Sequence, residues 1–139
     1  MNTCRILLVD DHVAIRAAVR SLLAHYHGIR IVGQASDGQQ ALDLMAFCRP
    51  HVILMDINMP RMNGIEATSA IKSSWKDTVV IGLSAVEDPQ HTNAIIKAGA
   101  VAVVSKHDIN DLYCTIQQVW INNPSMLIAA ASKLTPPLS

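Results

Sequence analysis

The sequence predicts an α/β fold, in which a parallel β-sheet is covered by helices on both faces. Short apolar segments alternate five times with longer segments whose apolar residues recur at helical spacing, the pattern of repeated strand–helix units. The short segments are rich in aliphatic residues, as expected for strands buried on both faces. Acidic, hydroxyl and lysine side chains follow several of these segments directly, at the edge where such sheets bind ligands.

The first part of the chain gives two strand–helix pairs. The predicted strands are residues 6–9 and residues 29–35. Each is followed by a segment with apolar residues three and four positions apart, which places them on one helical face. The predicted helices are residues 14–25, with Ile15, Val19, Leu22 and Leu23, and residues 38–49, with Ala41, Leu42, Leu44 and Met45.

The second part of the chain gives three more pairs. The predicted strands are residues 52–55, 79–83 and 100–105, and the predicted helices are residues 64–75, 89–98 and 109–121. Pro89 lies in the first turn of the fourth helix, where proline is favoured because its fixed φ suits a helix start. Asp108 directly precedes the fifth helix and is a candidate N-cap.

The composition is that of a single domain with a sizeable core. The chain has 139 residues, of which half are apolar and 16% are charged. Lys and Arg together number 11, as do Asp and Glu, so the net charge of zero gives no reason to expect a nucleic-acid surface. Cys4, Cys48 and Cys114 show no pairing or ligand spacing, which indicates reduced thiols in the cytoplasm.

No apolar run approaches the ~20 residues that cross a bilayer, and no signal-peptide pattern is present, so we expect no membrane partner.

The strand–helix alternation does not extend to the C-terminus. The pattern weakens after Asn122-Asn123-Pro124, and residues 134–139 contain two prolines. We therefore expect one domain over residues 1–123, followed by a tail or the start of a linker over residues 124–139.

Five polar side chains fall at the ends of predicted strands. Asp10 and Asp11 follow the first strand, Asp56 follows the third, Ser84 follows the fourth and Lys106 follows the fifth. Because the carboxyl ends of parallel strands share one edge, we expect these side chains to lie together. Three carboxylates in one place repel one another, and Mg²⁺, which prefers oxygen ligands, is the usual remedy.

This set of side chains predicts phosphoryl chemistry. A carboxylate can attack phosphorus and form an acyl phosphate. The metal ion and Lys106 would neutralise charge on the phosphoryl oxygens, which is most of what such a transfer requires of a protein. The hydroxyl group of Ser84 can reach a phosphoryl oxygen once one is present.

These residues, in this order, resemble the CheY-like receiver domain of bacterial two-component response regulators. The resemblance covers residues 4–122 approximately, and no single segment carries it. The matching segments are ILLVDDH at 6–12, VILMDINMP at 52–60, MNG at 62–64, LSA at 83–85 and the run from Ala98 to Lys106. It implies a flavodoxin-like (βα)5 fold with a five-stranded parallel sheet of order 2-1-3-4-5.

The resemblance also implies roles for individual residues. Asp56 is the expected phosphoacceptor. Asp11 is the expected direct Mg²⁺ ligand, with Asp10 acting through water, and Asp56 and the backbone carbonyl of Asn58 complete the metal site. Ser84 is the expected switch hydroxyl, and Lys106 is expected to contact the phosphoryl group.

A chain of this family is expected to be a cytoplasmic signalling module rather than a dedicated enzyme. It would take a phosphoryl group from a sensor histidine kinase, or from a small donor such as acetyl phosphate, and hydrolyse it slowly. Phosphorylation adds nearly two negative charges, which would switch a partner or homodimer surface. The expected output is control of transcription through a DNA-binding effector that this segment lacks.

Two positions depart from the usual receiver pattern. Val103 occupies the place of a tyrosine or phenylalanine whose rotation reports phosphorylation, so we expect the signal to leave through the segments after the fourth and fifth strands. His107 follows Lys106 where proline is common. Together with Asp11-His12, this favours the NarL/FixJ subfamily, whose effector is a LuxR-type helix-turn-helix, and Leu134-Thr135-Pro136 resembles the opening of such an effector. We expect either a truncated longer protein or a receiver that works alone.

Two other functions remain open at this point. A phosphatase of the haloacid-dehalogenase type also uses a strand-end aspartate and Mg²⁺, but it usually carries a second acid two residues later, where this chain has Asn58. A receiver that works without phosphorylation is the other alternative, and Val103 keeps it open. Taken singly, each site residue has an ordinary structural interpretation: Asp10 and Asp11 as helix-start acids, and Lys106 as a solvated lysine.

Overall fold

The computed structural model describes residues 3–85 and 88–121, which form a five-stranded parallel sheet of order β2-β1-β3-β4-β5. This is the predicted fold class and strand order. The strands are β1 (Cys4–Val9), β2 (Ile29–Ala35), β3 (Val52–Asp56), β4 (Val79–Ser84) and β5 (Ala102–Ser105). The α-helices are α1 (Val13–Leu23), α2 (Gly38–Cys48), α3 (Gly64–Ser74), α4 (Pro89–Ala98) and α5 (Leu112–Ile116).

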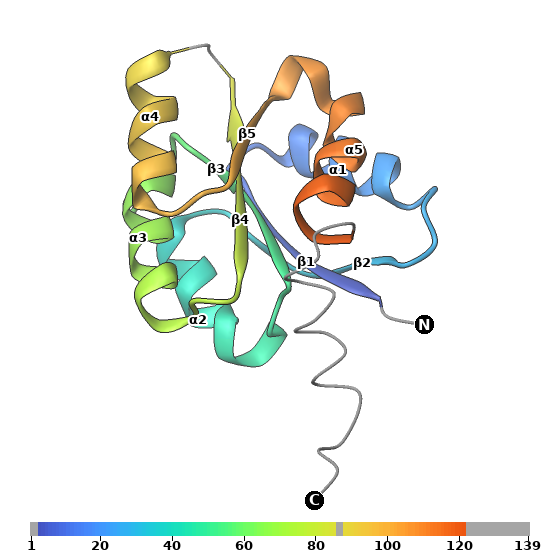
Figure 1. Ribbon diagram of the computed structural model, residues 1–139, viewed down its shortest axis with the longest axis horizontal. Helices are drawn as coiled ribbons and strands as arrows, with labels where there is room; N and C mark the ends of the chain where they lie inside the picture. Colours follow the sequence, from blue (N-terminus) through green and yellow to red (C-terminus); the bar gives the residue numbers. More distant parts are fainter. Residues whose placement is uncertain (1–2, 86–87, 122–139) are drawn as a thin grey trace, which may run out of the picture.

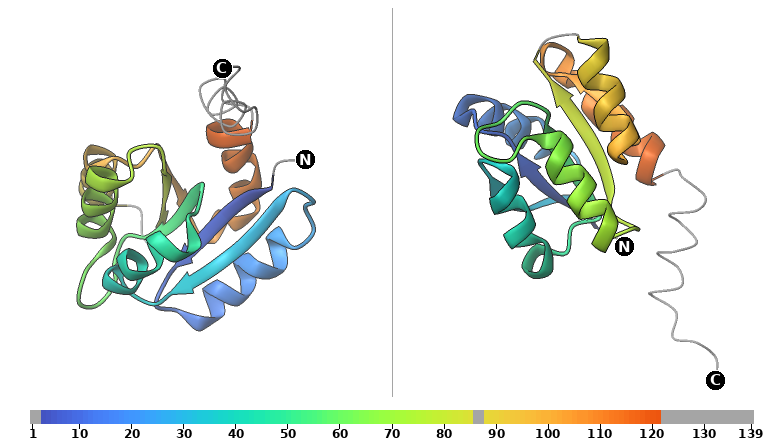
Figure 2. Two further views of the ribbon diagram at one scale, coloured as in Figure 1. Left: turned by 90° about the horizontal axis from the view of Figure 1, so that it is seen from below. Right: turned by 90° about the vertical axis from the view of Figure 1, so that its left-hand side faces the viewer.

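The sheet lies between two helical layers (Figure 1). On one face α1 and α5 cover a core that includes Leu8, Val19 and Leu112. On the other face α2, α3 and α4 cover a second core that includes Met45 and Ile95. The views in Figure 2 show the same separation. Burial on both faces explains why the central strands β3 and β4 are buried at every position.

The register of the sheet brings the predicted site residues to one edge. The relevant pairs are Val9 with Met55, Asp56 with Leu83 and Ser84 with Ser105. Asp10 therefore leaves β1 beside the point where Asp56 ends β3, and Lys106 leaves β5 beside the end of β4.

The segment after β5 differs from the single helix predicted over residues 109–121. A 3₁₀ turn (Lys106–Asp111) begins directly after the strand, α5 is short, and a π-helical turn (Gln117–Ile121) follows. Asp108 does not precede this segment but lies at a kink inside it, where its φ of −116° and ψ of 44° are non-helical. The capping group is the hydroxyl of Ser105, which accepts a hydrogen bond from the His107 backbone N–H at 3.1 Å.

The remaining differences are at element ends. β5 begins at Ala102 rather than at residue 100, because Gly99, with a φ of 128°, ends α4 and the Ala100 N–H closes that turn on Ile95. α1 ends two residues before its predicted end, and Tyr26 in the following turn stacks on Tyr113. The predicted boundary at residues 123–124 and the Leu134-Thr135-Pro136 motif lie outside the described residues. Within the described part of the chain, no helix has the length and apolar character needed to span a bilayer.

Candidate functional site

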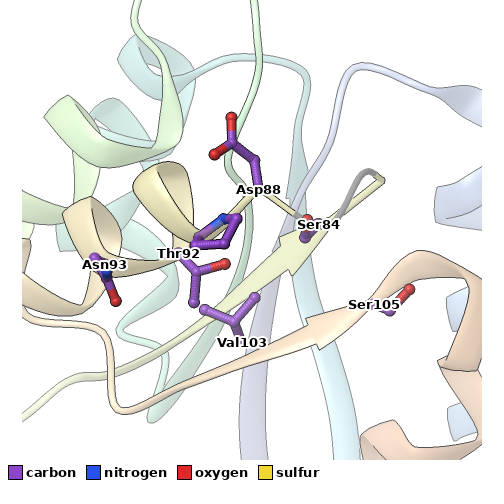
Figure 3. A pocket seen from close by; sticks show the side chains of 7 residues that line it. Ser84, Asp88, Thr92, Asn93, Val103 and Ser105 are labelled. Atoms are coloured by element: carbon purple, nitrogen blue, oxygen red, sulfur yellow. The ribbon is translucent and has the colours of Figure 1, made fainter.

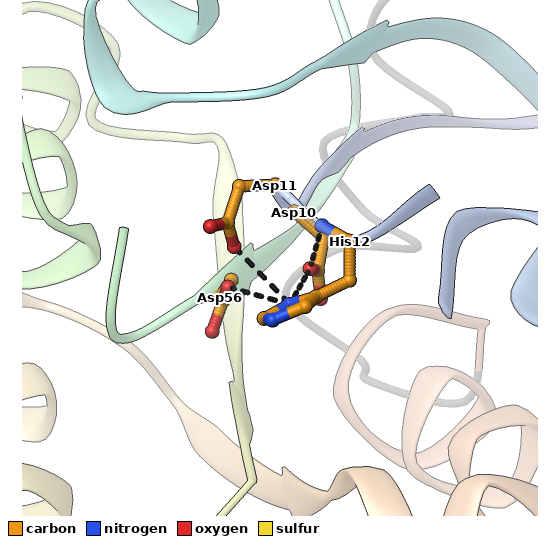
Figure 4. A group of neighbouring side chains, drawn as sticks. All are labelled: Asp10, Asp11, His12 and Asp56. Atoms are coloured by element: carbon orange, nitrogen blue, oxygen red, sulfur yellow. Dashed lines mark hydrogen bonds and ion pairs between the residues drawn. The ribbon is translucent and has the colours of Figure 1, made fainter. Parts of the chain in front are cut away.

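Three carboxylates meet at the carboxyl edge of the sheet, as the sequence predicts. Asp10 and Asp11 follow β1, and Asp56 is the last residue of β3 (Figure 4). Oxygen atoms of all three, together with a ring nitrogen of His12, lie within 4.8 Å of one another. Asp10 and Asp56 are 0% and 2% exposed, whereas Asp11 is half-buried. This edge of the sheet therefore concentrates negative charge where solvent access is low.

Lys106 lies between two of these carboxylates. Its Nζ is 2.7 Å from Asp10 Oδ2 and 3.1 Å from Asp56 Oδ1, and its side chain is only 5% exposed. An ammonium group is desolvated at this position only because two carboxylates compensate its charge. The solvated strand-end interpretation of Lys106 is therefore wrong.

His12 belongs to the same cluster, although sequence reasoning gave it no role. Its Nδ1 lies 2.9 Å from Asp10 Oδ1, 3.2 Å from Asp11 Oδ1 and 4.0 Å from Asp56 Oδ2 (Figure 4). Its backbone N–H also donates to Asp10 Oδ1 at 2.8 Å. The three carboxylates therefore converge around His12 Nδ1. The signal in the sequence was its position directly after the acidic pair.

The surroundings of Asp56 oppose its ionisation. Burial and the neighbouring Asp10 charge raise the pKa of Asp56 to about 7, against the opposing effect of the Lys106 ammonium. Asp56 Oδ2 is buried and accepts no hydrogen bond from the described residues. A buried carboxylate oxygen without a donor, beside two further carboxylates, fits a hard divalent cation such as Mg²⁺.

Asn58 lies beside this cluster through its backbone. Its N–H is 3.3 Å from Asp56 Oδ1, and its side chain is exposed. The loop that carries it turns sharply: the Gly64 N–H donates to the Ile57 carbonyl at 2.9 Å. A Cβ atom at Gly64 would lie 2.1 Å from the Asp56 carbonyl oxygen, so only glycine permits this close return.

Ser84 lies at the end of β4 and opens onto a pocket of about 370 Å³ (Figure 3). The pocket extends from the end of β4 over the start of α4 and is bounded by β5. Its lining residues are Ser84, Asp88, Pro89, Thr92, Asn93, Val103 and Ser105. Val103 contributes an aliphatic side chain to this space, which confirms that no aromatic ring fills it from β5.

His107 connects the two segments that follow β4 and β5. Its Nε2 lies 3.0 Å from the Ala85 carbonyl oxygen, so the ring N–H donates across the gap between them. The sequence showed His107 only as an unusual residue, because a contact between residues 22 positions apart has no local signal.

Comparison with known proteins gives a consistent result. The family model described as "Response regulator receiver domain" matches residues 6–117. The response regulator GacA of Pseudomonas protegens is 32% identical over 117 residues, which are 84% of this chain and 55% of that protein. The transcriptional regulatory protein DegU of Brevibacillus brevis is 36% identical over 105 residues, which are 76% of this chain and 44% of that protein. The chain spans about half the length of these relatives.

Solved structures show the same likeness. A two-component response regulator of the LuxR family from Aurantimonas superposes with a TM-score of 0.82 at 27% identity. The match covers 95% of this chain and 98% of that one.

Proposed function

This chain belongs to the response regulator receiver domain family, and from that premise we propose that Asp56 is its phosphoacceptor and that Asp10 and Asp11 hold the Mg²⁺ ion that supports phosphorylation. It is a receiver of two-component signal transduction, and its likeness to a LuxR-family regulator is consistent with the NarL/FixJ type. The observation that carries the proposal is the group of three carboxylates at one sheet edge, of which two are buried and bridged by the desolvated Lys106 ammonium.

The proposed reaction is an in-line phosphoryl transfer to a carboxylate. An Asp56 oxygen attacks the phosphorus of the donor, the bond from phosphorus to the donor nitrogen or oxygen breaks, and an acyl phosphate forms. The donor is a phosphohistidine of a sensor kinase, the class of protein that phosphorylates receivers, or a small molecule such as acetyl phosphate. Slow hydrolysis of the acyl phosphate returns the free carboxylate.

The residues around Asp56 have distinct proposed tasks. Asp10, Asp11, Asp56 and the Asn58 carbonyl would hold Mg²⁺, which supplies charge neutralisation for the phosphoryl oxygens. Lys106 already contacts Asp56 and is within reach of a group attached to it. Ser84 supplies a hydroxyl from the neighbouring strand end.

We propose that the output leaves through the segments after β4 and β5. The hydrogen bond from His107 to the Ala85 carbonyl joins these segments one residue beyond Ser84 and one beyond Lys106. A shift of Ser84 toward a phosphoryl group would therefore move the start of the 3₁₀ segment as well. Phosphorylation would in this way change a partner or homodimer surface, and in a longer protein it would control transcription.

The proposal is tested with a small phosphodonor that contains a P–N bond. With Mg²⁺ present, phosphoramidate should produce an acyl-phosphate signal in the ³¹P NMR spectrum of the protein. The signal should be absent from Asp56→Asn and from a sample with EDTA. Failure of the wild-type protein to form it would contradict the proposal and favour a receiver that works without phosphorylation.

The phosphatase alternative has its own assay in the same samples. A dedicated phosphatase would hydrolyse p-nitrophenyl phosphate over many turnovers, and a signalling module would not. Asn58, where such phosphatases carry an acid, supports the signalling function.

A further inference from the structure

Beyond the acidic cluster, the geometry points to an ion pair that positions the metal site: we propose that Asp37 and Arg61 together anchor the loop between β3 and α3, and that this anchor sets the affinity for Mg²⁺. The inference rests on the proposed function, because the loop carries Asn58, whose carbonyl is the proposed third protein ligand.

Asp37 is a buried charge with two well-defined partners. The residue is 1% exposed and is the N-cap of α2. Its Oδ1 accepts a hydrogen bond from the Gln40 backbone N–H at 2.9 Å, and its Oδ2 accepts one from Arg61 Nη2. The Gln40 hydrogen bond and the Arg61 charge together lower the pKa of Asp37, so the carboxylate is ionised at neutral pH.

Arg61 has a backbone conformation that needs support. Its φ is +66°, in the left-handed region, where a residue with a Cβ atom is disfavoured. The side chain is 73% exposed, so packing does not hold it there. The contact with the buried Asp37 carboxylate is the interaction that keeps this residue, and the loop around it, in one conformation.

A second contact joins the same two segments. The Gly38 backbone N–H donates to the Met62 carbonyl at 3.0 Å. A Cβ atom at Gly38 would lie 2.6 Å from that carbonyl oxygen, so the start of α2 lies directly against the loop. The Gly64 N–H closes the base of the loop on Ile57.

Asn58 lies inside the loop that these contacts define. It is three residues before Arg61 and one residue after Ile57, which the Gly64 contact holds. With the base fixed at Ile57 and the far side fixed at Arg61 and Met62, the peptide between them has few alternative conformations. Release of the Asp37 contact would leave the far side held only at Met62, so a metal ion would have to order more of the peptide around the Asn58 carbonyl when it binds.

The test is a double-mutant cycle on Mg²⁺ affinity, measured by isothermal titration calorimetry. Asp37→Asn keeps a good N-cap residue but removes the ion pair, and Arg61→Gln removes it from the other side. Each single variant should weaken Mg²⁺ binding by about 3- to 10-fold, and the double variant should be no weaker than the worse single variant. Arg61→Lys, which keeps the charge, should restore part of the affinity.

Whether Arg61→Gln weakens or strengthens Mg²⁺ binding distinguishes a positioning role of Arg61 from a purely electrostatic one. Removal of a positive charge near a cation site should by itself strengthen Mg²⁺ binding. The control Arg20→Gln, in the exposed last turn of α1, should leave Mg²⁺ binding nearly unchanged. Weaker binding in Arg61→Gln, with faster amide hydrogen exchange at Asn58 and Met59, supports the anchor. Unchanged or stronger binding would overturn it.

The outcome for the wild-type protein distinguishes this inference from the proposed function. If the wild type binds Mg²⁺ and Asp56→Asn does not, the proposed metal site is supported. The variants at Asp37 and Arg61 then test the anchor separately. If the wild type binds no Mg²⁺, the metal site and the anchor are both wrong.

Discussion

At the scale of residues, the carboxyl group of Asp56 is held in surroundings that disfavour its charge. Burial and the Asp10 carboxylate raise the pKa of Asp56 from its ordinary value of 3.8 to about 7, although Lys106 opposes the shift. Without a metal ion, folding therefore has to bury a proton or a poorly compensated charge on Asp56. This conflict is the energetic cost of burying the Asp56 carboxylate beside a second carboxylate.

The pH dependence of stability follows from this conflict. Because the pKa of Asp56 is higher in the folded state than in the unfolded state, the contribution of this group is largest below about pH 4 and is lost as pH rises through about 7. Asp56→Asn should therefore stabilise the metal-free protein at pH 8, by on the order of 2 kcal/mol, and have little effect near pH 4. Urea unfolding in EDTA at the two pH values measures the difference. An equal effect at both would show that Asp56 ionises normally.

The central site residues were predictable because each has a local signal. Asp10, Asp11, Asp56 and Lys106 directly follow or end strands, and parallel topology alone then brings them together. The metal-ligand role of the Asn58 carbonyl stays a prediction, since a backbone ligand leaves no mark in the side chains of a sequence.

Other residues at or near the site had a weaker signal in the sequence, or none. His12 looks like an ordinary residue at a helix start, and only the fold shows its ring among three carboxylates. The pair of Asp37 and Arg61 joins segments 24 residues apart, and one partner takes a left-handed backbone conformation that its sequence does not predict.

At the scale of elements, the ends of β4 and β5 are connected by the side chain of His107. If this bond transmits the signal, His107→Ala should leave phosphorylation of Asp56 unchanged but reduce the response of α4. The measurement is the change in backbone amide chemical shifts of α4 when beryllofluoride, a phosphoryl mimic, is added with Mg²⁺. His25→Ala, in the exposed turn after α1, is the matched control. An undiminished α4 response in His107→Ala would exclude this route.

The pocket beside β5 makes a second prediction at this scale. Val103 faces the space of about 370 Å³, whereas the adjacent Val104 is 6% exposed and packs in the core under α1 and α5. Val103→Phe should therefore change the free energy of unfolding by less than about 1 kcal/mol, while Val104→Phe should cost about 1–3 kcal/mol by overpacking. Thermal or urea unfolding of the two variants compares them. A larger loss for Val103→Phe would mean that the pocket is not available to a side chain.

The elements themselves were predicted to within two residues, with the segment after β5 as the main exception. The apolar spacing over residues 109–121 fits a single helix, and that spacing is retained in Leu112 and Ile116 on the buried face. The spacing does not encode the 3₁₀ start or the π-helical end, because these depend on how the Ser105 cap and the neighbouring segments constrain the chain.

At the scale of the whole molecule, the site depends on contributions from distant parts of one sheet. Strands β1, β3, β4 and β5 each deliver one or more groups to the same edge, and the two cores hold these strands in register. The strict alternation of strands and helices predicted the parallel sheet, and the resemblance to receiver domains predicted its strand order. The domain boundary at residues 123–124 stays a prediction, since it lies outside the described residues.

Metal binding should therefore stabilise the molecule as a whole. If Mg²⁺ binds the folded site and not the unfolded chain, as we propose, it should raise the free energy of unfolding at pH 8, by about 2.7 kcal/mol at 100 times its dissociation constant. Urea unfolding with and without Mg²⁺ measures the effect. Asp56→Asn should lose most of it, whereas an equal gain in the variant would place the ion elsewhere.

The most direct test of the central claim is an intact-mass measurement after incubation with Mg²⁺ and acetyl phosphate. We predict the addition of one phosphoryl group, which hydroxylamine removes because it is an acyl phosphate. The adduct should be lost with EDTA and in Asp56→Asn, and it should persist in Asp43→Asn, which changes an exposed aspartate on α2. No adduct on the wild-type protein, or an adduct that persists in Asp56→Asn, would contradict the assignment of Asp56 as the phosphoacceptor.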